Sequence, residues 1–394
     1  MLRDDMAFRA QRLEYYFSLT LMALLFFSNV FTTIKIFFVA FFLTLSMVVR
    51  RHKFLDINFC LLLGFLSLYF LNMLAFGEEF GIEALPLVLF PLVAYLTGKW
   101  VGFFSRDARD LLYKQITVGC SLAFFTVLSI GLSVHNYGFY GMARGVALIG
   151  LDNGQYSATV LGGFLIFLTA ISGTALSVSP RLSACGRAFI VILSLIGIFC
   201  AVRLGSRTHL GVFFASVLIG YYINRHYMTS TWRYFLYSLA AFFIVYTFWF
   251  INDESIMLSY YADRLNNSEV GISTFGGRTE KWGQSLGLLL SSPMGWGLNE
   301  TGYAHNLWLD AARKGGWWTL ICLLLLTWTA VKSLCLAFSQ NSNPLFRSII
   351  ACIGAGYFLL FSVEPILDGY HYSFAAFFAF LGGVNGFRDR TRRI

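Results

Sequence analysis

The sequence predicts an all-α polytopic membrane protein, and its composition supports this in two ways. Of the 394 residues, 57% are hydrophobic and only 12% are charged, whereas a soluble domain carries roughly 25% charged residues. Apolar runs of about 18 residues or more recur along the chain, each long enough to cross a ~30 Å hydrocarbon core. A β-barrel would instead show short segments of alternating hydrophobicity. We therefore expect residues 1–394 to form one integral membrane domain.

About twelve apolar runs are predicted to be membrane-spanning helices. Lys and Arg gather between alternate runs, as in RRHK (50–53) and RDRTRR (388–393). Because cytoplasmic loops carry the excess of Lys and Arg, both termini are expected to be cytoplasmic. The net charge of +9 then reflects topology rather than nucleic-acid binding. The predicted spans are residues 14–29, 32–49, 54–75, 85–104, 115–133, 155–178, 188–203, 208–224, 234–251, 316–337, 347–362 and 371–387.

Two long connections fall on the opposite side of the membrane, over residues 134–154 and 252–315. Connections longer than about 15 residues are usually functional or disordered. The second contains three tryptophans and the apolar run SLGLLLSS (285–292), so we expect it to fold against the membrane. An amphipathic helix is predicted to begin near Thr279 and to end at Ser292, before a proline. Another helix is expected to begin near His305 and to continue into the tenth span.

Three arginines do not follow the topology of the other cations. Arg203 and Arg207, in AVRLGSRTHLGVFF, lie between two apolar runs on the non-cytoplasmic side. Cations near a membrane interior are costly and often mark an anion site, although an arginine at a helix end can also reach the interface by itself. Arg278 follows a Gly-Gly pair in the long loop. Its planar guanidinium can bind phosphate oxygens through two hydrogen bonds, or it is a solvated loop residue.

His305 is the only histidine in the long loop. A neutral imidazole can act as a general base near pH 7; the alternative is a structural, hydrogen-bonded histidine. With Arg207 and Arg278 on the same side of the membrane, the set fits transfer from a phosphorylated lipid. The loop has no DxD-like acidic pair for a divalent metal: INDES (251–255) has one Asp and one Glu, but their spacing and context are poor. The cysteines show no ligand spacing. Chemistry without metal or cofactor is therefore expected, with arginines supplying the positive charge.

Three segments resemble the core pattern of the O-antigen ligase and polymerase superfamily. They are GSRTHLGVF (205–213), GGRTEKWGQSLGLLLSSPMGWGLN (276–299) and AHNLWLDAARKGG (304–316), all within residues 190–335. The resemblance covers a Ser-Arg pair at the head of a span, Arg-x-x-x-Trp, Pro-x-Gly-x-Gly, and His-Asn followed by an aliphatic helix. The layout of about twelve spans with a large loop before the tenth is also similar.

The resemblance implies a GT-C-type, inverting glycosyltransferase of the bacterial inner membrane. Such an enzyme transfers glycan from undecaprenyl pyrophosphate at the periplasmic face, without nucleotide sugar or metal. It implies that Arg207 and Arg278 bind the pyrophosphate and that His305 activates the acceptor hydroxyl. Further candidate substrate contacts lie in or near these segments and in the loop before the sixth span: Arg203, Arg144, Asp152, Asn153, Lys281, Trp282 and Asn306. For Asp152 or Asn153, an ordinary helix cap is the alternative.

Several functions remain open from the sequence. The leading interpretation is an O-antigen ligase with lipid A–core as acceptor and membrane lipids around it. A polymerase of O-antigen or exopolysaccharide has the same chemistry and a different acceptor. A transporter or flippase would show internal repeats and ionisable residues deep within spans, which this sequence does not show. A purely structural membrane protein leaves His305, Arg207 and Arg278 unexplained.

Overall fold

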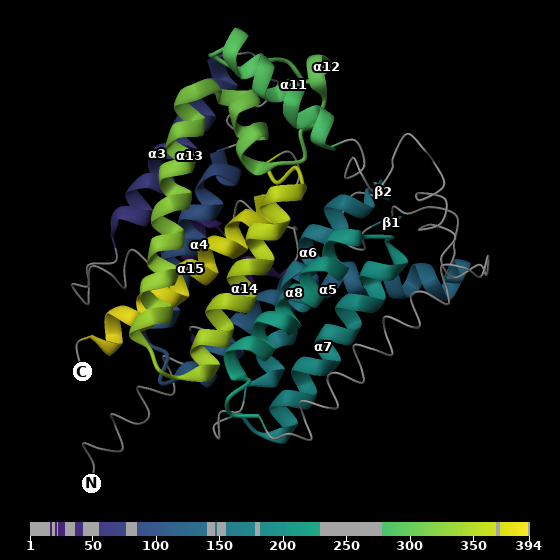
Figure 1. Cartoon of the computed structure of the whole chain (residues 1–394), viewed down its shortest axis with the longest axis vertical. Coiled ribbons are helices and arrows are strands. Elements are labelled where there is room, and N and C mark those ends of the chain that lie inside the picture. Colours follow the sequence, from purple (N-terminus) through teal and green to yellow (C-terminus); the bar gives the residue numbers. More distant parts are fainter. Residues whose placement is uncertain are drawn as a thin grey trace.

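The computed structural model describes residues 16–17, 20–21, 23–27, 36–41, 55–75, 85–139, 146–147, 155–177, 182–228, 278–367 and 371–392. This part of the chain is almost entirely helical (Figure 1). One short antiparallel pair, β1 (Val146–Ala147) with β2 (Gln155–Tyr156), precedes α6. The helices are α3 (Ile57–Ala75), α4 (Leu85–Phe103), α5 (Ala108–Tyr137), α6 (Ala158–Ala170), η2 (Ser172–Leu176), α7 (Ala184–Arg203), α8 (Arg207–Asn224), α11 (Arg278–Ser291), α12 (Leu298–Thr301), α13 (Leu307–Gln340), α14 (Pro344–Val363) and α15 (His371–Thr391).

The helices confirm a polytopic membrane protein. Within the described residues, six helical segments are long and apolar enough to cross a membrane. They are α3, α5, α6 with η2, α7, α13 and α14, and α4 has a shorter apolar segment. The total of about twelve spans stays a prediction, because residues 234–251 lie outside the described part and the first two predicted spans are described only in fragments.

α5 begins well before its apolar run predicts. It starts at Ala108 rather than near residue 115, because the Asp107 side chain caps it by accepting a hydrogen bond from Asp110 N. Lys114 is fully buried within α5 and lies 3.3 Å from the Asp110 carboxylate. α13 begins at Leu307, which confirms the helix predicted to start near His305 and to continue into the tenth span. Its Gly-Gly pair does not end the helix, but Gly316 takes φ 62° and ψ −160° and kinks it.

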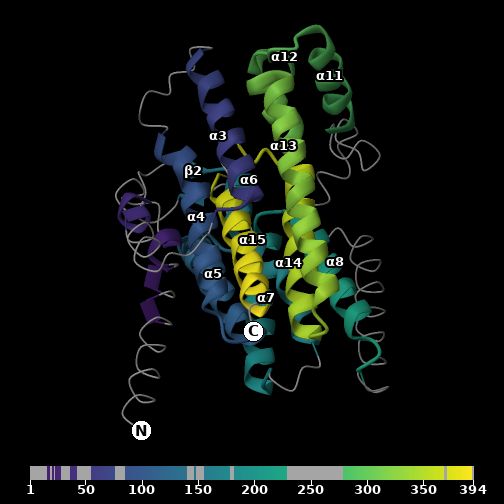
Figure 2. The same ribbon diagram turned by 90° about the vertical axis from the view of Figure 1, so that its left-hand side faces the viewer.

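α15 is the central helix of the bundle (Figures 1 and 2). Every residue from Tyr372 to Phe387 is buried. Glycines allow α4 and α15 to pack with their backbones in contact: a Cβ on Gly98 would overlap the Ala379 carbonyl, and one on Gly382 would overlap the Tyr95 carbonyl. Gly102 and Gly386 repeat the arrangement one turn further along each helix. Small residues four apart are a common device for close packing of membrane helices.

Buried polar groups fix the other helices to one another. His209 on α8 is within 2.6 Å of the Gly162 carbonyl on α6 through Nε2, and 2.7 Å from Ser206 Oγ through Nδ1. On the same helix, Ser216 Oγ accepts from Gly173 N at 2.9 Å and donates to the Ala170 carbonyl. These bonds satisfy groups that have no water to bind in a membrane interior. They also fix the N-terminal end of α8, where the candidate site lies.

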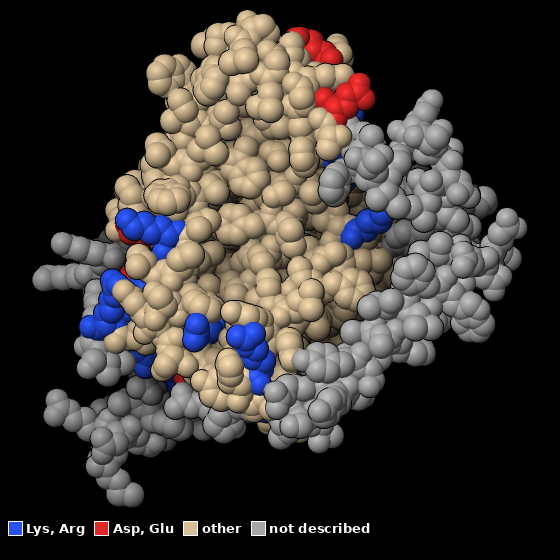
Figure 3. Space-filling model, in the orientation of Figure 1, with Lys and Arg blue, Asp and Glu red and all other residues tan. Residues whose placement is uncertain are grey.

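The two ends of the bundle differ in charge. In Figure 3 the Lys and Arg side chains of the visible face gather mainly over its lower part, below a broad uncharged area. Arginines at this end lie where α15 ends, where α14 and α5 begin, and where α8 ends: Arg388, Arg390, Arg392, Arg347, Arg106 and Arg225. Contacts join these regions, since Arg390 Nη1 donates to the Ser105 carbonyl. By the positive-inside rule this is the end expected in the cytoplasm.

Gly98→Ala is expected to destabilise the protein, because the added methyl group has no space beside the Ala379 backbone. Overpacking of this kind costs about 1–3 kcal/mol, and more when the obstacle is backbone. The measurement is the midpoint of thermal unfolding of the purified protein in detergent. Gly211→Ala is the matched control, since nothing lies within 4 Å of a Cβ there. Equal midpoints for both variants would contradict the close packing of α4 and α15.

Candidate functional site

Four parts of the chain meet at Glu364, the residue that follows α14. Its side chain is 8% exposed. Oε1 accepts a hydrogen bond from Thr208 Oγ1 on α8 at 2.8 Å and one from Arg278 Nη2 on α11 at 3.3 Å. Oε2 lies 4.0 Å from Nδ1 of His305, in the turn before α13. The carboxylate thus joins α8, α11 and the start of α13 at the end of α14.

Glu364 is not among the residues predicted for the site. It stands in FSVEPILD (361–368), as a lone acid between an apolar run and a proline. An acid placed at the end of a span is as unusual as a cation there, and this was the available signal. Glu364 N donates to the Leu360 carbonyl at 3.0 Å, so the backbone of this residue is still fixed by the last turn of α14.

Arg278 is the first residue of α11, as the predicted amphipathic helix requires. Its side chain is 24% exposed and forms the ion pair with Glu364. A guanidinium has five N–H donors, and this pair uses one face of the group. The remaining donors can bind an anion that approaches from solvent.

Arg207 is the first residue of α8 and directly precedes Thr208. Because Thr208 binds Glu364, the backbone of Arg207 lies beside the same cluster. The side chain is partly exposed. Within the described part of the chain, its guanidinium makes no hydrogen bond or ion pair. The structure therefore brings Arg278, His305 and Thr208 together around one carboxylate and places Arg207 next to them.

His305 has a φ of 54° and is the one non-glycine residue with a positive φ among those described. This left-handed conformation is uncommon for residues with a Cβ, and it persists only where surrounding contacts enforce it. The Asp310 carboxylate provides two of them: Oδ1 accepts from Ala304 N at 2.8 Å and Oδ2 accepts from Asn306 N at 3.1 Å. The amides on either side of His305 are thus held by one fully buried acid.

Trp282 and Asn306 complete the support of this turn. The Trp282 indole N–H donates to the Ala304 carbonyl at 2.8 Å. The Asn306 side chain caps α13 by accepting from Trp308 N and Leu309 N, and its Nδ2 donates to the Ser362 carbonyl at 3.2 Å. Both residues were expected to contact substrate. In this structure their polar groups position His305.

The imidazole of His305 is neutral over the physiological pH range. Burial lowers its pKa, and the positive charges of Arg278 and Lys281 lower it further, to about 4. Lys281 lies on α11, one turn after Arg278. Within the described residues its ammonium group has no acidic partner. The site therefore combines a neutral imidazole with an excess of positive charge.

The glycine motifs of the loop join α11 to α13. The kink at Gly316 lets Trp317 N donate to the Pro293 carbonyl at 2.9 Å, and a Cβ at Gly316 would overlap that carbonyl. Trp296 N donates to the Arg313 carbonyl at 2.9 Å, where Gly295 permits the approach with a φ of 112°. The Pro-x-Gly-x-Gly motif (293–297) and the Gly-Gly pair (315–316) therefore pack against each other. This contact places α11 and Arg278 beside His305.

Of the remaining predicted residues, Arg203 lies within the described part of the chain. Arg203 is 1% exposed at the end of α7, and its Nη2 lies 3.4 Å from Ser133 Oγ on α5. Arg144, Asp152 and Asn153 lie outside the described residues. Within the described part, no three His, Cys, Asp or Glu side chains form a group that could hold a metal ion. Metal independence stays an expectation.

Comparisons with known proteins do not assign this chain to a family. No family model matches it, and no curated protein matches it in sequence. A chain from a solved structure on "structural coordination of polymerization and crosslinking by a peptidoglycan synthase complex" is similar, with a TM-score of 0.44 and 18% identity. The match covers 85% of this chain and 98% of that chain. Similarity at this level identifies neither family nor activity, so membership of the O-antigen ligase superfamily stays a hypothesis.

Asp310→Asn is expected to loosen the turn at His305, because an amide has one acceptor oxygen where the carboxylate uses two. A hydrogen bond to a charged group contributes about 1.5–3 kcal/mol. The readout is the rate at which diethyl pyrocarbonate modifies His305, followed by mass spectrometry, and this rate should rise. Asp389→Asn is the control, because Asp389 lies near the C-terminal end of α15, at the other end of the bundle from His305. An unchanged rate in Asp310→Asn would show that other contacts hold the turn.

Proposed function

We propose that this protein is a glycosyltransferase that takes its glycan from a polyprenyl pyrophosphate, acting as an O-antigen ligase at the periplasmic face of a bacterial inner membrane. The observation that carries the proposal is the convergence of Arg278 and His305 on Glu364, with Arg207 beside them. The motif resemblance supports the same assignment. In this proposal undecaprenyl pyrophosphate carries the donor glycan and lipid A–core is the acceptor.

The charges at the site suit a pyrophosphate leaving group. Arg278 is oriented by its bond to Glu364 at 3.3 Å, and Arg207 and Lys281 add two cations without described acidic partners. Guanidinium groups bind phosphate oxygens through paired hydrogen bonds. Cations fixed where negative charge develops lower the barrier most, because they need no reorganisation during the reaction. Here they stabilise the pyrophosphate as the anomeric C–O bond breaks and its electron pair passes to the leaving oxygen.

His305 is proposed to act as the general base on the other side of the anomeric carbon. Its neutral imidazole accepts the proton of the acceptor hydroxyl while that oxygen forms the new glycosidic bond. Attack opposite to the leaving group inverts the anomeric configuration. Glu364 Oε2, 4.0 Å from Nδ1, stabilises the imidazolium that forms, and the proton then passes to solvent. Glu364 is thus a positioning residue that links the base to the leaving-group cation.

His305→Ala is expected to reduce glycan transfer by about 10²–10⁴-fold, the usual contribution of a general base. The measurement is the lipopolysaccharide banding pattern of a strain that lacks this gene, complemented with wild type or variant at equal protein level. Loss of all O-antigen-capped bands with accumulation of lipid-linked long glycan identifies a ligase. Core carrying a single repeat identifies a polymerase with the same chemistry. Arg278→Ala and Arg207→Ala should each lose about 10²–10³-fold.

His226→Ala is the matched control, because this histidine is exposed beyond the far end of α8. It should complement fully. A ladder unchanged by deletion of the gene would rule out both O-antigen functions. Full complementation by His305→Ala would remove the role of His305 as base and leave the arginine assignments to be judged separately.

The pH dependence of transfer should reflect the lowered pKa of His305, about 4. An imidazole with its ordinary pKa of about 6.5 becomes protonated, and inactive as a base, near that pH. Here the rate is expected to stay level from about pH 8 to about pH 5 and to fall only as the pH approaches that lowered pKa. Lys281→Gln removes one of the causes, so the fall should move to higher pH. Assays use purified enzyme and lipid-linked donor in detergent.

The lowered pKa of His305 is also expected to make the folded protein less stable at low pH. In the unfolded chain the imidazole binds a proton near its ordinary pKa of about 6.5, whereas the folded protein binds it only near the lowered value. The unfolded state is therefore favoured as the pH falls through this window, and the free energy of unfolding decreases.

A wild-type transfer rate that falls around pH 6.5, with no effect of Lys281→Gln, would contradict the proposed electrostatics of the site.

A further inference from the structure

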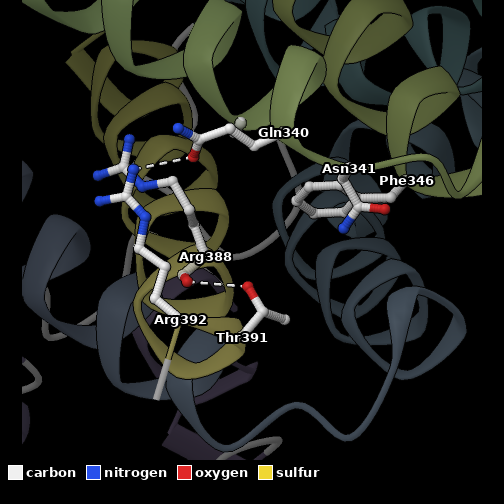
Figure 4. A pocket seen from close by; sticks show the side chains of 7 residues that line it. Gln340, Asn341, Phe346, Arg388, Thr391 and Arg392 are labelled. Carbon is white, nitrogen blue, oxygen red and sulfur yellow. Dashed lines mark hydrogen bonds between the residues drawn. The ribbon is translucent and has the colours of Figure 1, made fainter. Parts of the chain in front are cut away.

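A second polar site lies at the opposite end of the bundle from His305. A cavity of about 240 Å³ is present where α13 ends, α14 begins and α15 ends (Figure 4). It is lined by Arg388 on α15 and by Arg392 directly after it, and by Gln340 at the end of α13, Asn341 in the connection and Phe346 on α14. This end carries the arginine clusters that the positive-inside rule places in the cytoplasm. The catalytic proposal does not use any of these residues.

The two arginines stand one helical turn apart on the same face of α15. Like charges at this spacing repel each other, so an anion between them is favoured. Figure 4 shows both side chains directed toward Gln340, and Arg392 Nη2 donates to Gln340 Oε1 at 2.9 Å. This bond orients the Arg392 guanidinium at the rim of the cavity.

Arg388 is the more buried of the two and has a donor to spare. Its side chain is 16% exposed, and Nη2 lies 3.7 Å from Oδ1 of Asp389, the one acid described close to it. Asp389 also lies 3.6 Å from Lys99 Nζ, so its charge is shared. The Arg388 Nε–H is buried and has no hydrogen-bond partner within the described residues. A buried donor of this kind normally has a partner, and a phosphate oxygen in the cavity would supply one.

We propose that this cavity binds the phosphate headgroup of an anionic phospholipid of the cytoplasmic leaflet. Arg388 and Arg392 hold the phosphate, and Asn341 provides a polar wall opposite them. The apolar lining formed by Ala337 and Phe346 suits the start of the acyl chains, and Leu336, next to Ala337 on α13, is 38% exposed. Basic pockets between membrane helices at this level are typical sites for anionic lipid headgroups. A free phosphate would use the arginines but not the apolar lining.

The test measures lipid binding to the purified full-length protein in detergent by native mass spectrometry. Dioleoyl phosphatidylglycerol is titrated against dioleoyl phosphatidylcholine. The anionic lipid is expected to bind and the zwitterionic lipid to bind far more weakly. The double variant R388Q/R392Q should bind phosphatidylglycerol about 30-fold more weakly. This corresponds to a loss of about 1 kcal/mol of binding free energy for each arginine. Unchanged binding in R388Q/R392Q would overturn the proposal.

R106Q/R225Q is the matched control, because it removes two exposed arginines from the same end of the bundle, away from the cavity. Its binding should stay within about twofold of wild type; an equal loss in both double variants would show general attraction and overturn the site. If R388Q/R392Q does not fold, N341W keeps both arginines and blocks the cavity, and it should abolish the adduct. Inorganic phosphate alone, tested at millimolar concentration, should not displace the lipid. Displacement by phosphate would show a phosphate site and overturn the lipid assignment.

Discussion

The candidate site depends on the burial of one carboxylate. Glu364 is 8% exposed at the end of a membrane helix, where an uncompensated charge would be very costly. Its compensation comes from Thr208 and Arg278, which are far from it in sequence. The ends of α8, α11 and α14 can meet only if these bonds form together. The same carboxylate faces His305, so one electrostatic requirement brings Arg278 and His305 together.

The turn at His305 shows how a strained residue is held ready to act. A left-handed conformation costs free energy. Asp310 and Trp282 offset that cost through bonds to the backbone on either side of His305, and the Asn306 side chain anchors the turn by donating to the Ser362 carbonyl. None of these bonds uses the imidazole. The ring is therefore positioned without being occupied, which a base requires before its substrate arrives. The Gly316 kink likewise fixes the position of α11 relative to this turn through backbone hydrogen bonds, such as the one from Trp317 N to the Pro293 carbonyl.

Patterns local in the sequence were predicted well, and long-range contacts were not. The apolar periodicity and the Gly-Gly and Pro punctuation gave α11 within one residue of its limits, Arg278 and Ser291. The helix predicted to begin near His305 and to continue into the tenth span was confirmed by α13, which begins at Leu307, whereas its kink at Gly316 was not predicted. Glu364 was missed because its importance comes from His305, Arg278 and Thr208, which are 59 to 156 positions away. The contact of Gly98 with α15 was likewise invisible, since a glycine shows its partner only in the fold.

The distribution of charge at the site favours the binding of an anion. Arg278 is paired with Glu364, whereas Arg207 and Lys281 have no acidic partner among the described residues. Cations at the end of the bundle that is expected on the non-cytoplasmic side are unusual under the positive-inside rule. Burial lowers the pKa of His305, and Arg278 and Lys281 lower it further. A pyrophosphate would remove this imbalance on binding. In the proposed reaction the leaving pyrophosphate gains negative charge beside the cations, while His305, on the other side of the anomeric carbon, gains the proton. Glu364 lies between Arg278 and His305, so in that proposal one buried carboxylate links the two charge changes.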